Sequence, residues 1–179
     1  MAQYTVHSAM SRLLRSSLVF LLLLAPVLSH AESKPSADLP NFSGYWKLDA
    51  AKSDFGGMPA PDSAGYVIRH IGAKLTFDYT QDSKTTRVDI TTDGQERMTD
   101  SNEETEIWTR AYWEGPVLVF EARQRPRPAH DNPNVRWTSH WKLSPDNKVL
   151  TIERQITAPQ GQLNQVLVFN RETKETARQ

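Results

Sequence analysis

Residues 42–48 read FSGYWKL and open the part of the chain in which apolar and polar side chains alternate with a period of two. Such alternation is typical of a β-strand with one buried face, because successive side chains of a strand point to opposite sides of the sheet. No later stretch shows the sustained stripe of an amphipathic helix. The pattern therefore predicts an all-β domain that begins with this strand.

Further runs show the same alternation along most of the chain. The clearest are residues 74–79, 87–91, 135–143 and 149–156, and residues 166–169 form a short, fully apolar run. The only helix we expect is a single turn around residues 49–54, which Gly56 and Gly57 would end.

Turn residues separate these runs and indicate how consecutive strands connect. Asp93-Gly94 lies between two alternating segments and is a strong hairpin signal. Glu114-Gly115-Pro116 separates two further runs, and Ser144-Pro145-Asp146-Asn147 suits a type I turn. Short strands at this spacing predict an antiparallel up-and-down meander of about eight to ten strands. Closure into a β-barrel is favoured over a sandwich, because an open sheet of this length would leave bare edges.

The F-x-G-x-W-K-L pattern of residues 42–48 resembles the opening strand of the lipocalins and fatty-acid-binding proteins, the calycin group. The resemblance implies that Trp46 plugs one end of the barrel and that Gly44 lets the chain bend there. It also implies that a cationic side chain of the last strand, here Arg171, packs over Trp46 in a cation–π contact. Residues 41–61, 144–154 and 165–171 resemble, in addition, a set of exported lipocalin-like bacterial proteins of unknown role.

The chain departs from these families in two places. The second lipocalin motif, an acidic residue ahead of a tyrosine, has no match near Thr99-Asp100. The stretch between Leu48 and Tyr66 is too short for the two-helix lid of the fatty-acid-binding proteins. The gating that such a lid provides is therefore not expected here.

The N-terminus is expected to be a signal peptide that spans residues 1–31. Arg12 and Arg15 precede an apolar run at residues 17–28, and Ser29-His30-Ala31 offers small residues for cleavage. The alternative is an uncleaved signal anchor, although the run is shorter than the roughly 20 apolar residues of a membrane span. Cleavage near Ala31 would place the protein in the periplasm or outside the cell, with no membrane span left.

The remaining chain is divided by composition. We expect a flexible linker at residues 32–40, a lipocalin-like barrel domain at residues 41–173 and a C-terminal tail at residues 174–179.

Composition excludes several classes of function. The chain has 21 Lys+Arg and 21 Asp+Glu, a balance that argues against a nucleic-acid-binding protein. The absence of cysteine excludes disulfides, zinc–thiolate sites and thiol catalysis. The outward strand faces carry Lys, Arg, Asp and Thr, whereas an outer-membrane barrel would be apolar there. No serine lies in a nucleophile motif, and we expect no catalytic residue, no metal and no cofactor.

The candidate ligand-binding residues lie on the predicted inner faces of the strands. They are Tyr79, Phe120, Trp137, Trp141, Ile152 and Arg154. Arg154 is unusual because it shares a face with Leu150 and Ile152, and a buried guanidinium needs an acidic partner or an acidic ligand group. The alternative, which the sequence favours, is that Arg154 lies near a strand end and extends into solvent.

The other polar clusters have ordinary explanations. His70, His130 and His140 do not have the spacing of metal ligands, so we expect them at the surface. The arginine- and proline-rich stretch at residues 123–133 is expected to be an exposed hairpin connection, and the alternative is a role in binding phosphate, lipid head groups or an acidic partner.

The favoured hypothesis is a protein that binds a small hydrophobic or amphipathic ligand inside the barrel. One alternative is an envelope protein-interaction module with a filled core that acts through loops such as residues 123–133. The least favoured is a barrel enzyme built on histidine and acidic side chains. The sequence leaves the identity of the ligand and the oligomeric state open.

Overall fold

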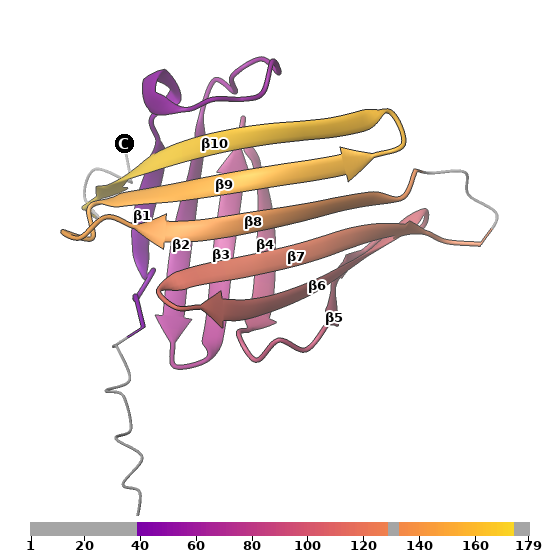
Figure 1. Ribbon diagram of the computed structural model, residues 1–179, viewed down its shortest axis with the longest axis horizontal. Coiled ribbons are helices and arrows are strands. Elements are labelled where there is room, and N and C mark those ends of the chain that lie inside the picture. Colours follow the sequence, from indigo (N-terminus) through magenta and orange to yellow (C-terminus); the bar gives the residue numbers. More distant parts are fainter. Residues whose placement is uncertain (1–38, 129–132, 174–179) are drawn as a thin grey trace, which may run out of the picture. The chain divides into compact units, whose positions relative to one another are not determined.

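The computed structural model describes residues 39–128 and 133–173. The expected signal peptide, most of the linker, His130 and the C-terminal tail lie outside the described residues. The elements in chain order are β1 (Gly44–Leu48), η1 (Ala50–Lys52), β2 (Ala64–Ile71), β3 (Lys74–Gln81), β4 (Lys84–Thr91), β5 (Arg97–Ser101), β6 (Thr105–Glu114), β7 (Val117–Pro126), β8 (Val135–Leu143), β9 (Val149–Ala158) and β10 (Gly161–Glu172) (Figure 1).

The strands form one sheet of ten, in the order β4-β3-β2-β1-β10-β9-β8-β7-β6-β5, and every pair is antiparallel. Each strand pairs with its neighbours in sequence except at one point, and β1 pairs with β10 to bring the two ends of the meander together. This confirms the prediction of an all-β, antiparallel up-and-down barrel. No helix among the described residues is long and apolar enough to cross a membrane.

The exception is the connection between β4 and β5, which lie at opposite ends of the strand order. A few hydrogen bonds bridge the seam, among them one from the Gly94 amide to the Ala111 carbonyl at 2.8 Å and one from Trp113 Nε1 to Thr92 Oγ1 at 3.2 Å. The barrel is therefore nearly closed, without a continuous ladder at the seam.

The prediction of a hairpin at Asp93-Gly94 is wrong, because the two flanking strands do not pair with each other. The dipeptide does form a turn, in which Gly94 has a φ of 74° and the Asp93 carboxylate accepts hydrogen bonds from the Gln95 amide and from Arg97. A turn dipeptide determines the backbone of only a few residues. Which strand a flanking strand pairs with depends on the side chains along the full length of that strand. Here β4 pairs with β3 and β5 pairs with β6, so the turn carries the chain across the seam.

Aromatic side chains fill the centre of the barrel. The Trp141 ring lies 4.7 Å from Phe120 and 5.2 Å from Tyr66, and Tyr66 lies 5.1 Å from Phe169, measured between ring centroids. Their buried neighbours include Phe42, Ile68, Leu75, Leu118, Leu150 and Ile152. Interlocked rings of this size leave the centre packed, and any remaining space must lie toward the rims.

Trp46 and Arg171 lie against each other where β1 meets β10. The Arg171 guanidinium is 4.3 Å from the centre of the Trp46 ring, and it donates hydrogen bonds to the carbonyls of Ser43 and Asn147, both at 2.6 Å. Gly44 has a φ of 145°, and a Cβ there would stand 2.8 Å from Arg171 Nη1. Only a glycine leaves room for this contact at the barrel rim.

The connection from β1 to β2 holds a short strap, which we define as residues 53–61. The helical turn expected around residues 49–54 is present as the single 3-10 turn η1. The strap is hydrogen-bonded to β10, because the Asp54 and Val166 amides each donate to the other's carbonyl at 2.7 and 2.8 Å. At Gly56, with a φ of 64°, a Cβ would meet the Asn164 carbonyl oxygen at 2.3 Å. The strap therefore lies close against the barrel wall without any α-helix.

Candidate functional site

A cavity of about 210 Å³ lies beneath the strap. The strap contributes Phe55, Met58 and Pro59 to its walls. The barrel contributes inner-face residues of β3, β9 and β10, which are Tyr79, Gln81, Arg154, Ile156, Gln165, Leu167 and Phe169. Most of this lining is apolar, and Arg154 is the only charged residue among the residues that line it.

Arg154 lies in the middle of β9, on the same face as the fully buried Leu150 and Ile152. Its Nε donates to Ser139 Oγ at 3.4 Å, and among the described residues no carboxylate forms an ion pair with it. The side chain is half-buried beside the buried Tyr66. The favoured sequence interpretation, that Arg154 extends into solvent from a strand end, is therefore wrong. The barrel interior therefore holds a positive charge to which the described part of the chain supplies no negative partner.

Two tyrosines lie next to this charge. The rings of Tyr66 and Tyr79 are 4.6 Å apart. Burial raises the pKa of Tyr66, and the nearby Arg154 opposes that shift. Burial also raises the pKa of Tyr79 to about 12, so both phenols stay neutral at physiological pH. The tyrosines thus supply neutral hydroxyl groups and no counter-charge for Arg154.

The six predicted ligand-binding residues do not lie together. Tyr79 and Arg154 line the cavity beneath the strap. Phe120, Trp141 and Ile152 have exposed fractions of 6%, 3% and 0% and belong to the packed centre. Trp137 is not among the residues that line this cavity, and it lines a second cavity described below.

Sequence reasoning missed the strap residues and Tyr66. For the stretch FGGMPAP at residues 55–61 the sequence predicts only that Gly56 and Gly57 end a helical turn, although the apolar residues Phe55 and Met58 stand out in a connecting segment. Tyr66 alternates with Val67 and Arg69, which could have placed it on an inner face. No local sequence pattern predicts that the strap folds back over β10.

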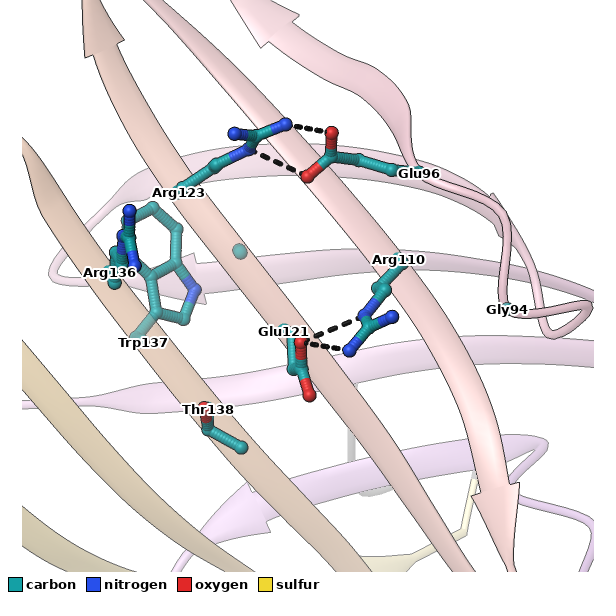
Figure 2. A pocket seen from close by; sticks show the side chains of 9 residues that line it. Gly94, Glu96, Arg110, Glu121, Arg123, Arg136, Trp137 and Thr138 are labelled. Atoms are coloured by element: carbon teal, nitrogen blue, oxygen red, sulfur yellow. Dashed lines mark hydrogen bonds and ion pairs between the residues drawn. The ribbon is translucent and has the colours of Figure 1, made fainter.

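A larger cavity, of about 560 Å³, opens on the outer face of β6, β7 and β8 (Figure 2). The segment Gly94–Glu96 forms one of its walls, and three arginines line it. Arg123, assigned from sequence to an exposed hairpin connection, is part of β7.

The histidines differ from the prediction at one position. His140 lies on the outer face of β8, whereas His70 is buried with an exposed fraction of 8%, so its predicted surface position is wrong. The His70 ring stacks on Trp113, its Nδ1 accepts from the Phe42 amide at 3.4 Å, and its Nε2 has no partner among the described residues. Burial lowers the pKa of His70. Among the described residues no three His, Asp or Glu side chains gather as a metal site would require.

The fold is a nearly closed antiparallel β-barrel, and it is similar to that of the lipocalins and fatty-acid-binding proteins. Solved structures with this fold include a zebrafish ileal bile acid-binding protein in complex with cholic acid (13% identity, 73% of this chain and 98% of that chain covered, TM-score 0.53). They also include the REP1-NXSQ fatty acid transporter (13%, 73% and 96%, TM-score 0.52) and a secretary abundant heat soluble (SAHS) protein from Ramazzottius varieornatus (17%, 73% and 94%, TM-score 0.53). At these identities the likeness is one of fold. No protein-family model and no curated protein sequence matches the chain.

Proposed function

We propose that this chain is an exported barrel protein that binds a small amphipathic acid in the cavity beneath the strap. The acid group would lie at Arg154, and the apolar part would lie against the strap and β10. The observation that carries this proposal is the guanidinium of Arg154, which has no ion-pair partner among the described residues and lies on the wall of a mostly apolar cavity.

The charge of Arg154 favours an anionic ligand. A guanidinium that is partly withdrawn from water needs an anion or several acceptors, and here the protein offers the Ser139 hydroxyl and two neutral tyrosines. A ligand carboxylate would satisfy the remaining donors with two parallel hydrogen bonds. Proteins of similar fold include a bile acid-binding protein in complex with cholic acid and a fatty acid transporter, which supports a ligand of this kind.

The size of the cavity favours a short or compact ligand. Pockets for drug-sized ligands typically measure about 300–1,000 Å³, and this cavity measures about 210 Å³. The packed rings of Phe120 and Trp141 prevent a long tail from entering the centre of the barrel. We therefore expect medium-chain acids to bind better than long-chain ones.

Isothermal titration calorimetry with octanoate and octanol tests the proposal, because the two probes share a chain length and differ in charge. We expect octanoate to bind more tightly than octanol, and Arg154→Gln to weaken octanoate binding about tenfold or more while octanol binding changes little. The control is Arg69→Gln, since Arg69 is exposed on β2. Equal binding of octanoate by Arg154→Gln and by the unaltered protein would show that Arg154 is not the anchor. No binding of either probe would remove the cavity as a ligand site.

Export is a separate part of the proposal and has its own test. The basic and apolar pattern of residues 12–28 and the small residues before Glu32 support cleavage near Ala31. The intact mass of the protein recovered from the periplasm or medium should correspond to a chain that starts at Glu32. A full-length mass in the membrane fraction would instead identify an uncleaved anchor.

A second candidate function is a protein-interaction module that acts through its outer surface. The packed aromatic centre favours it, because little interior space remains for a ligand. Native mass spectrometry distinguishes the two: a small mass that is lost on denaturation indicates a ligand, and a bare barrel that still retains a protein partner indicates a module.

A further inference from the structure

The outer-face cavity is built on three neighbouring strands. In β6, β7 and β8 the buried residues Ala111, Phe120 and Ser139 point inward. Because side chains alternate along a strand, Arg110 and Arg123 point outward, as does Arg136. The Gly94–Glu96 segment, held to β6 by the hydrogen bond from the Gly94 amide, closes one side (Figure 2).

Two glutamates lie in this cavity, and both are already engaged by side chains. Both Glu96 oxygens accept hydrogen bonds from Arg123, one from Nε at 2.7 Å and the other from Nη2. Glu121 accepts from Arg110 Nε at 2.8 Å on one oxygen and from the Tyr112 hydroxyl at 2.8 Å on the other. The acceptors of the cavity are therefore largely used within the protein (Figure 2).

Several hydrogen-bond donors in the cavity have no acceptor among the described residues. Arg110 and Arg123 bind their glutamates through Nε and Nη2. The third nitrogen of each guanidinium, Nη1, makes no hydrogen bond or ion pair with described residues, although the Arg110 guanidinium also lies 5.2 Å from the centre of the Tyr112 ring. Arg136 and Thr138, on the same face of β8, line the cavity and make no side-chain hydrogen bond or ion pair with described residues. The cavity therefore presents more free N–H and O–H donors than free acceptors to a ligand.

The charges also do not balance. Among the described residues that line the cavity, Arg110, Arg123 and Arg136 are accompanied by two carboxylates. Arg136 lies directly opposite Arg123 in the β7–β8 ladder, and like charges that face each other across a sheet destabilise it. An anion between the two guanidiniums would remove this repulsion.

We propose that this cavity is a binding site for a phosphate group. The free donors come from three strands and from both arginine and threonine, so they approach from several directions. A tetrahedral phosphate has enough oxygens to accept from all of them, whereas a planar carboxylate has only two. The volume of about 560 Å³ exceeds that of free phosphate, which favours a phosphate carried by a larger organic group.

The soluble and membrane sources of such a phosphate are distinguished by two probes. Isothermal titration calorimetry with glycerol 3-phosphate tests the soluble ester, with sodium chloride at equal ionic strength as the blank. Sedimentation with phosphatidylcholine vesicles that contain phosphatidic acid tests the same chemistry on a membrane, with pure phosphatidylcholine vesicles as the blank. Binding in either arm supports the proposal and identifies the source.

The residue dependence decides whether binding occurs at this cavity. We expect Arg136→Gln to weaken binding about tenfold or more, because one charged partner of the phosphate is lost. Arg69→Gln, which removes an exposed arginine on β2, should bind like the unaltered protein. Thr138→Val provides a second variant that keeps the charge and removes one donor. Equal weakening by Arg136→Gln and Arg69→Gln, or no binding in either arm, would overturn the proposal.

Discussion

The contact between Arg171 and Trp46 predicts a measurable share of the stability of the barrel. Arg171→Met keeps an unbranched side chain of similar reach and removes the charge and the donors. The lost cation–π contact is worth about 0.5–2 kcal/mol. The two hydrogen bonds to the Ser43 and Asn147 carbonyls contribute about 1 kcal/mol each, because water can reach these groups and replace part of each bond. We expect the free energy of unfolding to fall by about 3 kcal/mol.

Urea denaturation followed by circular dichroism measures this difference. The midpoint should decrease at an unchanged m-value, because the surface exposed on unfolding stays the same. Arg171→Lys should lose roughly half as much as Arg171→Met, since it keeps the charge but not the guanidinium geometry. Arg69→Met is the control for an exposed arginine and should change stability by less than about 0.5 kcal/mol. A loss below about 1 kcal/mol in Arg171→Met would refute the structural role given to this contact.

Three further perturbations have distinct expected outcomes. Burial lowers the pKa of His70, so the unfolded chain binds a proton there at a higher pH than the folded protein does. The free energy of unfolding should therefore decrease as the pH falls from 7.5 to 5.5. His70→Phe should lose this component in urea titrations at the two pH values, and an unchanged pH dependence would contradict it. Gly56→Ala should destabilise more than Gly57→Ala in thermal melts, because both have positive φ but only the Gly56 Cβ meets backbone, the Asn164 carbonyl at 2.3 Å. Trp141→Ala should reduce the free energy of unfolding by about 3–5 kcal/mol in urea, since the ring is in the packed centre, and a loss under 1 kcal/mol would mean that the centre is loosely packed.

Much of the local structure could be predicted from short patterns. The alternation of residues 74–79 and 135–143 corresponds to β3 and β8, and residues 144–147 form a turn in which the Asn147 amide donates to the Ser144 carbonyl at 2.8 Å. Such signals depend on only a few consecutive residues. A chain with strong alternation therefore reveals its strands without knowledge of their partners.

Two errors have a common physical cause. Asp93-Gly94 forms its turn, but the partners of β4 and β5 depend on complete strand registers. His70 has the apolar residues Ile68 and Leu75 as structural neighbours, yet a histidine in an alternating strand fits a buried or an exposed face equally well from sequence. In both cases the outcome depends on residues far away in the chain.

By itself, the sequence determined the all-β class, most strand positions and the residues FSGYWKL that begin the barrel, because side-chain alternation and turn chemistry act over short distances. Only the tertiary structure decided where the seam lies, that Arg154 lines the cavity beneath the strap, and that three arginines gather on the outer face. These features depend on the register of strands distant in sequence and on how their side-chain volumes fill the barrel. The spaces left over from that packing are the two sites proposed for ligands.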